Sequence, residues 1–227
     1  MSPLFVRTAG LLLLSNSALK SSTVARCLSP SQIYRQRPGK LALSLGDRFQ
    51  YGVHYDATAA PVVHTPALKV LVAWAVHLGL LLFQWDVGAA FYGNKMDRPG
   101  VIVQLPPGYD PDSEELRPLD APPLYGELAD ALPGIPQGSL LHYQNLTPDL
   151  RTLDFKALAA DNCLFLHETI QMATSLHVDD GVLACPSLAH AEAVLGAAGL
   201  SAKRKITWGP LSHTLGIDFK VSYSATR

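Results

Sequence analysis

Two adjacent carboxylates, Asp179 and Asp180, interrupt the otherwise apolar segment LHVDDGVLAC, residues 176–185. Carboxylate oxygens are ligands that Mg²⁺ prefers, so a converging pair could bind a divalent cation. Successive side chains of a strand point to opposite faces, and the two aspartates can converge only where the chain bends; Asp180 followed by Gly181 is a strong hairpin signal. The segment therefore predicts either a metal site at a hairpin tip or a solvated turn, and turn chemistry alone favours the solvated turn.

A third carboxylate, Asp86, lies near the end of a second apolar run, LLLFQWDV, residues 80–87. This run has the length of a buried strand. We expect it to lie beside the hairpin, where Asp86 could meet Asp179 and Asp180. These three aspartates are the candidate catalytic and metal-binding residues.

The elements that must position these carboxylates follow from periodicity and from turn residues. Thr65 before Pro66 marks a helix start, and apolar residues then recur at helical spacing up to Gly79. Further expected elements are strands at 80–87 and 100–105, a helix from 139 to about 155 that Pro148 interrupts, strands at 162–170 and 172–185, and a helix capped by Ser187 that ends at Gly199. This order predicts an α+β fold, an antiparallel sheet with helices on one face.

Composition bounds the class of protein. The chain has 227 residues, of which 48% are hydrophobic and 16% charged, enough to bury a core. A net charge of -1 and a pI near 6.7 provide no global basic field. Any contact with nucleic acid must therefore come from local patches.

Cysteine and histidine spacing indicates no further metal site. Cys27, Cys163 and Cys185 are far apart and form no C-x-x-C pair, so we expect free thiols. The eight histidines show no metal-ligand spacing such as H-E-x-x-H.

The first 39 residues contain no acidic residue and several basic ones, a composition typical of a transit peptide. The alternative is an unassigned, poorly ordered leader, whose composition then indicates no compartment. Its apolar run, Leu11 to Leu14, is far too short to span a membrane. The main body, residues 40–227, is expected to be soluble.

Ordered motifs resemble the reverse transcriptase of copia-like long-terminal-repeat retrotransposons over about residues 40 to 220. The resemblance rests on RFQYGVHYDATAAPVV (48–63), QWDVGAAF followed by VIVQLPPGY, GIPQGSLLHY (134–143), LDFKALAADNCLF (153–165), HVDD and GPLSHTLGIDF (209–219). It implies a polymerase palm with partial fingers, acting as an RNA-directed DNA polymerase in a cytoplasmic, virus-like-particle context.

The resemblance also implies roles for single residues. Asp86, Asp179 and Asp180 match the catalytic aspartates, which would hold two Mg²⁺ ions, with Mn²⁺ as an alternative. Phe91 and Gln137 match positions beside the incoming nucleotide. Lys40 keeps one basic residue of a phosphate-holding segment. The implied partners are an RNA or DNA template with its primer, a dNTP and the rest of a retrotransposon polyprotein, with no membrane.

Departures from the family pattern leave a second interpretation open. Ala42, Pro136, His142 and His177 stand where the family has arginine, lysine, tryptophan and tyrosine. The thumb, connection and ribonuclease H regions are expected to be missing from this chain. The alternative is therefore a decayed or repurposed palm fragment that does not polymerise, and an unrelated metal-binding domain is a third hypothesis.

Overall fold

The computed structural model describes residues 49–104, 118–122 and 124–223, together with the backbone of five short strands nearer the N-terminus. The chain divides into two compact units. Unit 1 comprises residues 1–59 and 91–142, and unit 2 comprises residues 60–90 and 143–227.

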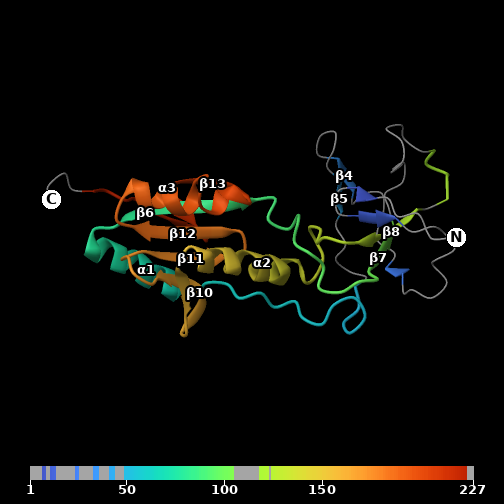
Figure 1. Ribbon diagram of the computed structural model, residues 1–227, viewed down its shortest axis with the longest axis horizontal. Coiled ribbons are helices and arrows are strands. Elements are labelled where there is room, and N and C mark those ends of the chain that lie inside the picture. Colours follow the sequence, from blue (N-terminus) through green and yellow to red (C-terminus); the bar gives the residue numbers. More distant parts are fainter. Residues whose placement is uncertain are drawn as a thin grey trace. The chain divides into compact units, whose positions relative to one another are not determined.

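Unit 2 is built on a six-stranded antiparallel sheet in the order β13-β6-β12-β11-β10-β9 (Figure 1). Its central strands carry the candidate carboxylates and are nearly continuous apolar runs, as expected for strands covered on both faces. The strands are β6 (Leu81–Gly88), β9 (Phe155–Leu158), β10 (Asp161–His167), β11 (Ala173–His177), β12 (Asp180–Cys185) and β13 (Lys205–Pro210).

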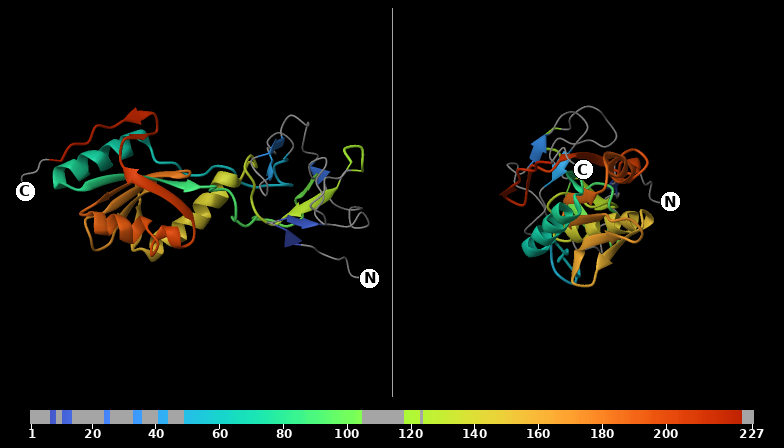
Figure 2. Two further views of the ribbon diagram at one scale, coloured as in Figure 1. Left: turned by 90° about the horizontal axis from the view of Figure 1, so that it is seen from above. Right: turned by 90° about the vertical axis from the view of Figure 1, so that its left-hand side faces the viewer.

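Helices cover both faces of this sheet, so the expectation of helices on one face is wrong. Helix α1 (Thr65–Leu78) packs through Leu68, Leu71 and Ala75 on the face that carries Leu82 and Val182. The opposite face packs against α2 (Gly138–Thr152) and α3 (Leu188–Leu195), as Figure 2 shows. Successive side chains of β6 and β12 point to opposite faces, so each strand presents apolar side chains to the helices on both faces. The sequence pattern did not reveal that both faces are covered.

Local capping explains where α1 ends and where α3 begins, whereas His64, the N-cap residue of α1, makes no side-chain cap bond. Gly79 follows α1 in the left-handed conformation (φ 66°), and its amide donates to main-chain carbonyls of the last turn. The helix was predicted to end at this glycine. Ser187 caps α3 by accepting the His190 amide, also as predicted. Helix α3 ends at Leu195, four residues before the expected Gly199.

Helix α2 and the segment after it differ from the expectation. Pro148 lies inside one helix that the structure does not split. The helix ends at Thr152, a few residues before the expected end near Phe155, because Asp154 adopts a positive φ of 60° and the chain turns into β9. Beyond β13, the strands β14 (His213–Thr214) and β15 (Ile217–Asp218) form a small hairpin.

Unit 1 contains a five-stranded sheet in the order β1-β2-β8-β7-β3. A core cluster that includes Phe49, Val103, Leu128 and Leu141 is buried in this unit. The bounds are β1 (Arg7–Thr8), β2 (Leu11–Leu13), β3 (Val24–Ala25), β7 (Ile102–Gln104) and β8 (Tyr125–Leu128), and β4 (Ile33–Arg35) pairs separately with β5 (Leu41–Leu43). The strand predicted at 100–105 corresponds to β7, whereas β8 was not foreseen.

The expectations for the N-terminal segment fall largely outside the described residues, and the leader assignment stays a prediction. Among the helices that the structure describes, none has both the length and the apolar character needed to cross a bilayer.

Candidate functional site

Asp86 and Asp180 lie directly opposite each other on the neighbouring strands β6 and β12. The hairpin of β11 and β12 brings Asp179 to the same end of the sheet, where its carbonyl oxygen accepts the Val87 amide at 3.0 Å. Asp86, Asp179 and Asp180 are each half-buried. The predicted meeting of Asp86 with the hairpin is therefore seen in the strand register for Asp180, and Asp179 lies in the adjoining turn.

The turn of the hairpin comes earlier than predicted. Val178 and Asp179 form the turn, while Asp180 is already paired with both His177 and Asp86 in the sheet. Val178 has φ 57°, which is rare for a β-branched residue and costs conformational energy. Gly181 is thus a strand residue, and the Asp-Gly turn signal assigned the bend to the wrong dipeptide.

The electrostatics of Asp180 reflect crowding by carboxylates. Burial raises the pKa of Asp180 above its ordinary value, and the charges of Asp179 and Asp86 raise it further. A side-chain hydrogen bond with Asp86 acts in the same direction, whereas His177 lowers this pKa. The ionised form is therefore disfavoured, and a bound cation would relieve the repulsion.

A divalent cation fits the chemistry of this donor set, because hard cations such as Mg²⁺ prefer carboxylate oxygens. The side chains are not, however, arranged as a ready three-ligand site. Within the described part of the chain, no group of three or more His, Cys, Asp or Glu side chains is placed to hold a metal ion. The structure brings two carboxylates together, Asp86 and Asp180, with Asp179 adjacent along the chain.

A pocket of about 290 Å³ adjoins these carboxylates. Its lining includes Gln84, Asp86 and Asp180, with Thr207 on β13 and His213 on β14. Thr207 is the direct cross-strand partner of Asp86 on the side away from Asp180. The pocket therefore presents acidic, hydroxyl and imidazole groups beside one another.

Gln84 shapes this pocket and was missed by the sequence reasoning. Its side-chain oxygen accepts the amides of Ser212 and His213 at 2.8 and 3.0 Å and the Ser212 hydroxyl at 3.1 Å. These bonds fasten the segment before β14 to β6. The available signal was strand periodicity, since a residue two positions before Asp86 must share its face.

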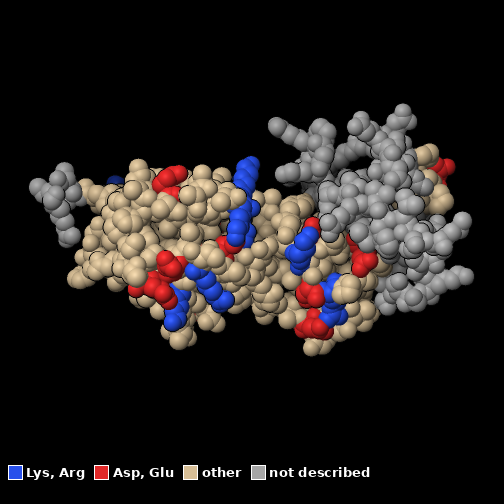
Figure 3. All heavy atoms as spheres, in the orientation of Figure 1, with Lys and Arg blue, Asp and Glu red and all other residues tan. Residues whose placement is uncertain are grey.

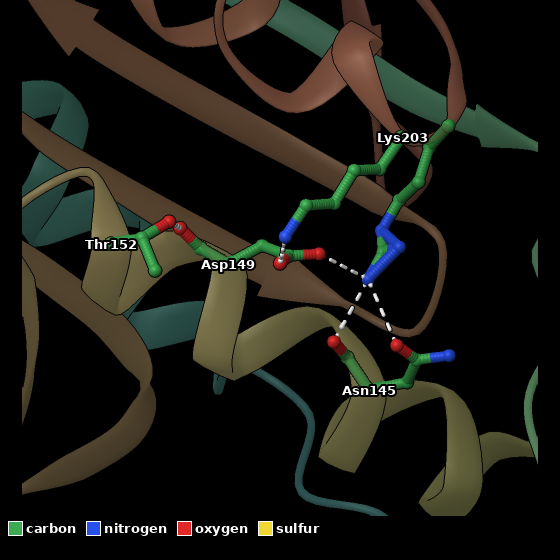
Figure 4. A network of polar contacts seen from close by, with 5 residues as sticks. Asn145, Asp149, Thr152 and Lys203 are labelled. Carbon is green, nitrogen blue, oxygen red and sulfur yellow. Dashed lines mark hydrogen bonds and ion pairs between the residues drawn. The ribbon is translucent and has the colours of Figure 1, made fainter.

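A polar network holds the segment that enters β13. The Asp149 carboxylate on α2 forms ion pairs with the Lys203 ammonium at 2.7 Å and the Arg204 guanidinium at 2.6 Å (Figure 4). Arg204 also donates to the Asn145 carbonyl at 2.8 Å. Arg204 and Asp149 are mostly buried, with side chains 12% and 14% exposed. The network anchors the start of the strand that pairs Thr207 with Asp86.

The other predicted site residues lie elsewhere. Phe91 and Gln137 belong to unit 1, where the Phe91 ring packs beside Gly138. The Gln137 side chain is fully buried and donates to the His54 carbonyl at 3.1 Å, so it faces the interior of the unit. Lys40 lies outside the described residues.

Charged side chains are sparse and mixed on the face shown in Figure 3. Lysine and arginine there stand singly or beside aspartate and glutamate, and no continuous basic surface covers the described residues in this view. This agrees with the absence of a global basic field in the composition.

Comparison with known proteins identifies a family. No curated protein matches the chain. The sequence profile described as reverse transcriptase (RNA-dependent DNA polymerase) matches residues 41–226. This match includes β6, the β11–β12 hairpin and all three aspartates. The chain therefore belongs to the reverse transcriptase family.

Proposed function

We propose that this chain is the RNA-directed DNA polymerase domain of a copia-like retrotransposon, a palm with partial fingers. The carrying observation is the pairing of Asp86 with Asp180 across β6 and β12, within a chain of the reverse transcriptase family. The proposed substrates are a dNTP and a primer annealed to an RNA or DNA template.

The proposed reaction is nucleotidyl transfer. The primer 3′ oxygen bonds to the α-phosphorus of the dNTP, pyrophosphate departs, and the hydroxyl proton passes to solvent. Asp86, Asp179 and Asp180 would hold two Mg²⁺ ions, which neutralise triphosphate charge and activate the 3′ hydroxyl. Mn²⁺ is the alternative cation. The three carboxylates would hold these ions at one end of the sheet, where the ladder of β6 with β12 keeps Asp86 opposite Asp180.

The pocket beside the carboxylates would receive the reacting ends of the substrates. Thr207 and His213 supply hydrogen-bonding groups there, and Gln84 fixes the segment that carries His213. Phe91 is proposed to contact the incoming nucleotide, and Lys40 its phosphates, from the family pattern alone. Gln137 would join them only if its side chain, which is fully buried and bonded to the His54 carbonyl, turned outward.

The second candidate is a decayed or repurposed palm that folds without polymerising. Two observations favour it. The described residues hold no ready three-ligand metal group, and charge on the surface in Figure 3 is sparse and mixed. Tight binding of duplex nucleic acid depends on many phosphate contacts from basic side chains.

Primer extension on an RNA template with Mg²⁺ distinguishes the two candidates. We expect the wild-type chain to extend the primer and Asp86→Asn and Asp180→Asn each to abolish extension while remaining folded by circular dichroism. Asp120→Asn, at an exposed position of unit 1, is the matched control and should extend normally. A folded wild-type chain as inactive as the aspartate variants would establish the decayed palm instead.

A further inference from the structure

Trp85 immediately precedes Asp86 in β6 and points to the other face of the sheet. Its side chain is buried among core residues packed against α2 and α3 and is 2% exposed. The indole Nε1 donates to the Thr174 hydroxyl on β11 at 3.1 Å. Because β12 lies between β6 and β11, the indole must cross β12 to make this bond.

The crossing point is Gly181, the direct strand partner of Trp85. A Cβ atom on Gly181 would lie less than 3.0 Å from the indole atoms Cε2, Cζ2 and Nε1, closer than real Cβ atoms approach. The side chain at this position must therefore be absent for the indole to lie where it does. This explains a glycine that the turn does not require.

The next pair in the same ladder is Asp86 with Asp180. A one-residue slip of β12 would place a side chain beneath the indole and turn every side chain of the strand to the other face. Trp85 and Gly181 thus fit together only in the register that sets the two carboxylates opposite each other. The Thr174 hydrogen bond ties the third strand into the same register.

We propose that Trp85 and Gly181 are positioning residues for the carboxylate pair. They hold Asp86 and Asp180 opposite each other despite their mutual repulsion, so that the pair meets a divalent cation without rearrangement. This inference rests on the proposed function, since it assigns the pair a cation. Neither Trp85 nor Gly181 is required to touch substrate.

A size-swap cycle tests the packing. Gly181→Ala should lower the melting temperature markedly in the wild-type chain, because the new methyl group collides with the indole. In a Trp85→Leu background the same change should be tolerated, since the collision is gone. The melting temperatures of the four proteins, measured without divalent cations, give the coupling between the two positions.

Cation affinity tests positioning. By titration calorimetry with Mn²⁺, we expect Trp85→Leu to bind about tenfold more weakly, as is usual when residues that orient metal ligands are changed. Trp85→Phe, which keeps a ring over Gly181 but loses the bond to Thr174, should retain most of the affinity. Trp74→Leu is the control: it removes a partly buried indole from α1, away from the carboxylates, and should leave Mn²⁺ affinity unchanged.

The outcomes separate the inference from the proposed function. If the wild-type chain binds Mn²⁺ and Trp85→Leu binds it equally well, the positioning role is refuted and the proposed function stands. If Gly181→Ala is equally damaging in both backgrounds, the packing argument is refuted. If the wild-type chain binds no Mn²⁺, the proposed function and the positioning role fail together, while the melting temperatures still decide the packing.

Discussion

Asp180→Asn should stabilise the folded chain while destroying the proposed activity. In the wild-type protein, burial and the charges of Asp179 and Asp86 raise the pKa of Asp180, so its ionised form opposes folding. Asparagine keeps the shape and can still donate a hydrogen bond to Asp86. The substitution therefore removes a repulsion without opening a cavity.

The size of the effect follows from the strand register. Side chains directly opposite in an antiparallel pair have Cβ atoms about 5 Å apart, and two unit charges at that distance repel by about 1 to 3 kcal/mol at effective dielectric constants from about 80 to about 20. Both carboxylates are half-buried, so solvent screening favours the lower end. We expect a gain of about 1 kcal/mol in the free energy of unfolding at pH 8 without divalent cations.

The dependence on pH has a definite sign. The pKa of Asp180 is higher in the folded chain than in the unfolded chain. The contribution of Asp180 to the free energy of unfolding is therefore fully present below the ordinary aspartate pKa, and it is lost as pH rises through the raised pKa of the folded chain. The advantage of Asp180→Asn should therefore be small near pH 4 and largest near pH 8. Urea denaturation at both pH values measures it, with Asp120→Asn as a control that should shift neither.

Mg²⁺ should reverse the comparison. A cation bound by the carboxylates stabilises the wild-type chain in proportion to its occupancy, and Asp180→Asn loses that gain. The reasoning is refuted if Asp180→Asn is less stable than wild type at pH 8 without cations, or if the difference does not change with pH.

Three further changes test the structure around the site. Asp161→Ala removes a buried carboxylate that accepts hydrogen bonds from the His64 and Cys163 amides. Burial alone would raise the pKa of Asp161, but these bonds outweigh burial and lower it. The free energy of unfolding should therefore fall by about 1 to 3 kcal/mol in urea denaturation at pH 7, and this difference from wild type should vanish as pH falls through the lowered pKa. Burial raises the pKa of Cys163 to about 12 and that of Cys185 to about 11, so neither thiol should react with iodoacetamide at pH 8 until urea unfolds the chain; fast labelling of the native protein would contradict this. Ser187→Ala should cost about 1 kcal/mol by removing the cap of α3, and Ser187→Asp should restore it in thermal melts.

Much of unit 2 could be predicted because its signals are local. The proline in the first turn of α1 and the glycine after its last residue, the apolar run of β6 and the serine cap of α3 each fix an element without reference to the rest of the chain. The meeting of Asp86 with the hairpin followed from placing two apolar strands side by side. The carboxylate pair was therefore within reach of sequence reasoning.

Features that depend on packing could not be predicted in this way. Gly181 looked like a turn residue because the contact that requires a glycine comes from Trp85, nearly a hundred positions earlier in the chain. Gln84 looked like an interruption in an apolar run, since its partners, Ser212 and His213, lie far along the sequence. The buried side chain of Gln137 likewise donates to a main-chain carbonyl that lies far away in the sequence, that of His54.

Helices on both faces of the sheet still leave the carboxylates accessible, because α1 covers only part of its face. Leu82 is buried in the cluster with α1, whereas Gln84 and Asp86, next on the same face of β6, are half-buried and line the pocket. At the other end of α1, the His64 amide is bonded to Asp161 at the start of β10, three strands away in the sheet order. The helix thus crosses the sheet diagonally and leaves the Asp86 end of β6 uncovered. The polar side chains on that face begin where the helix no longer covers the sheet.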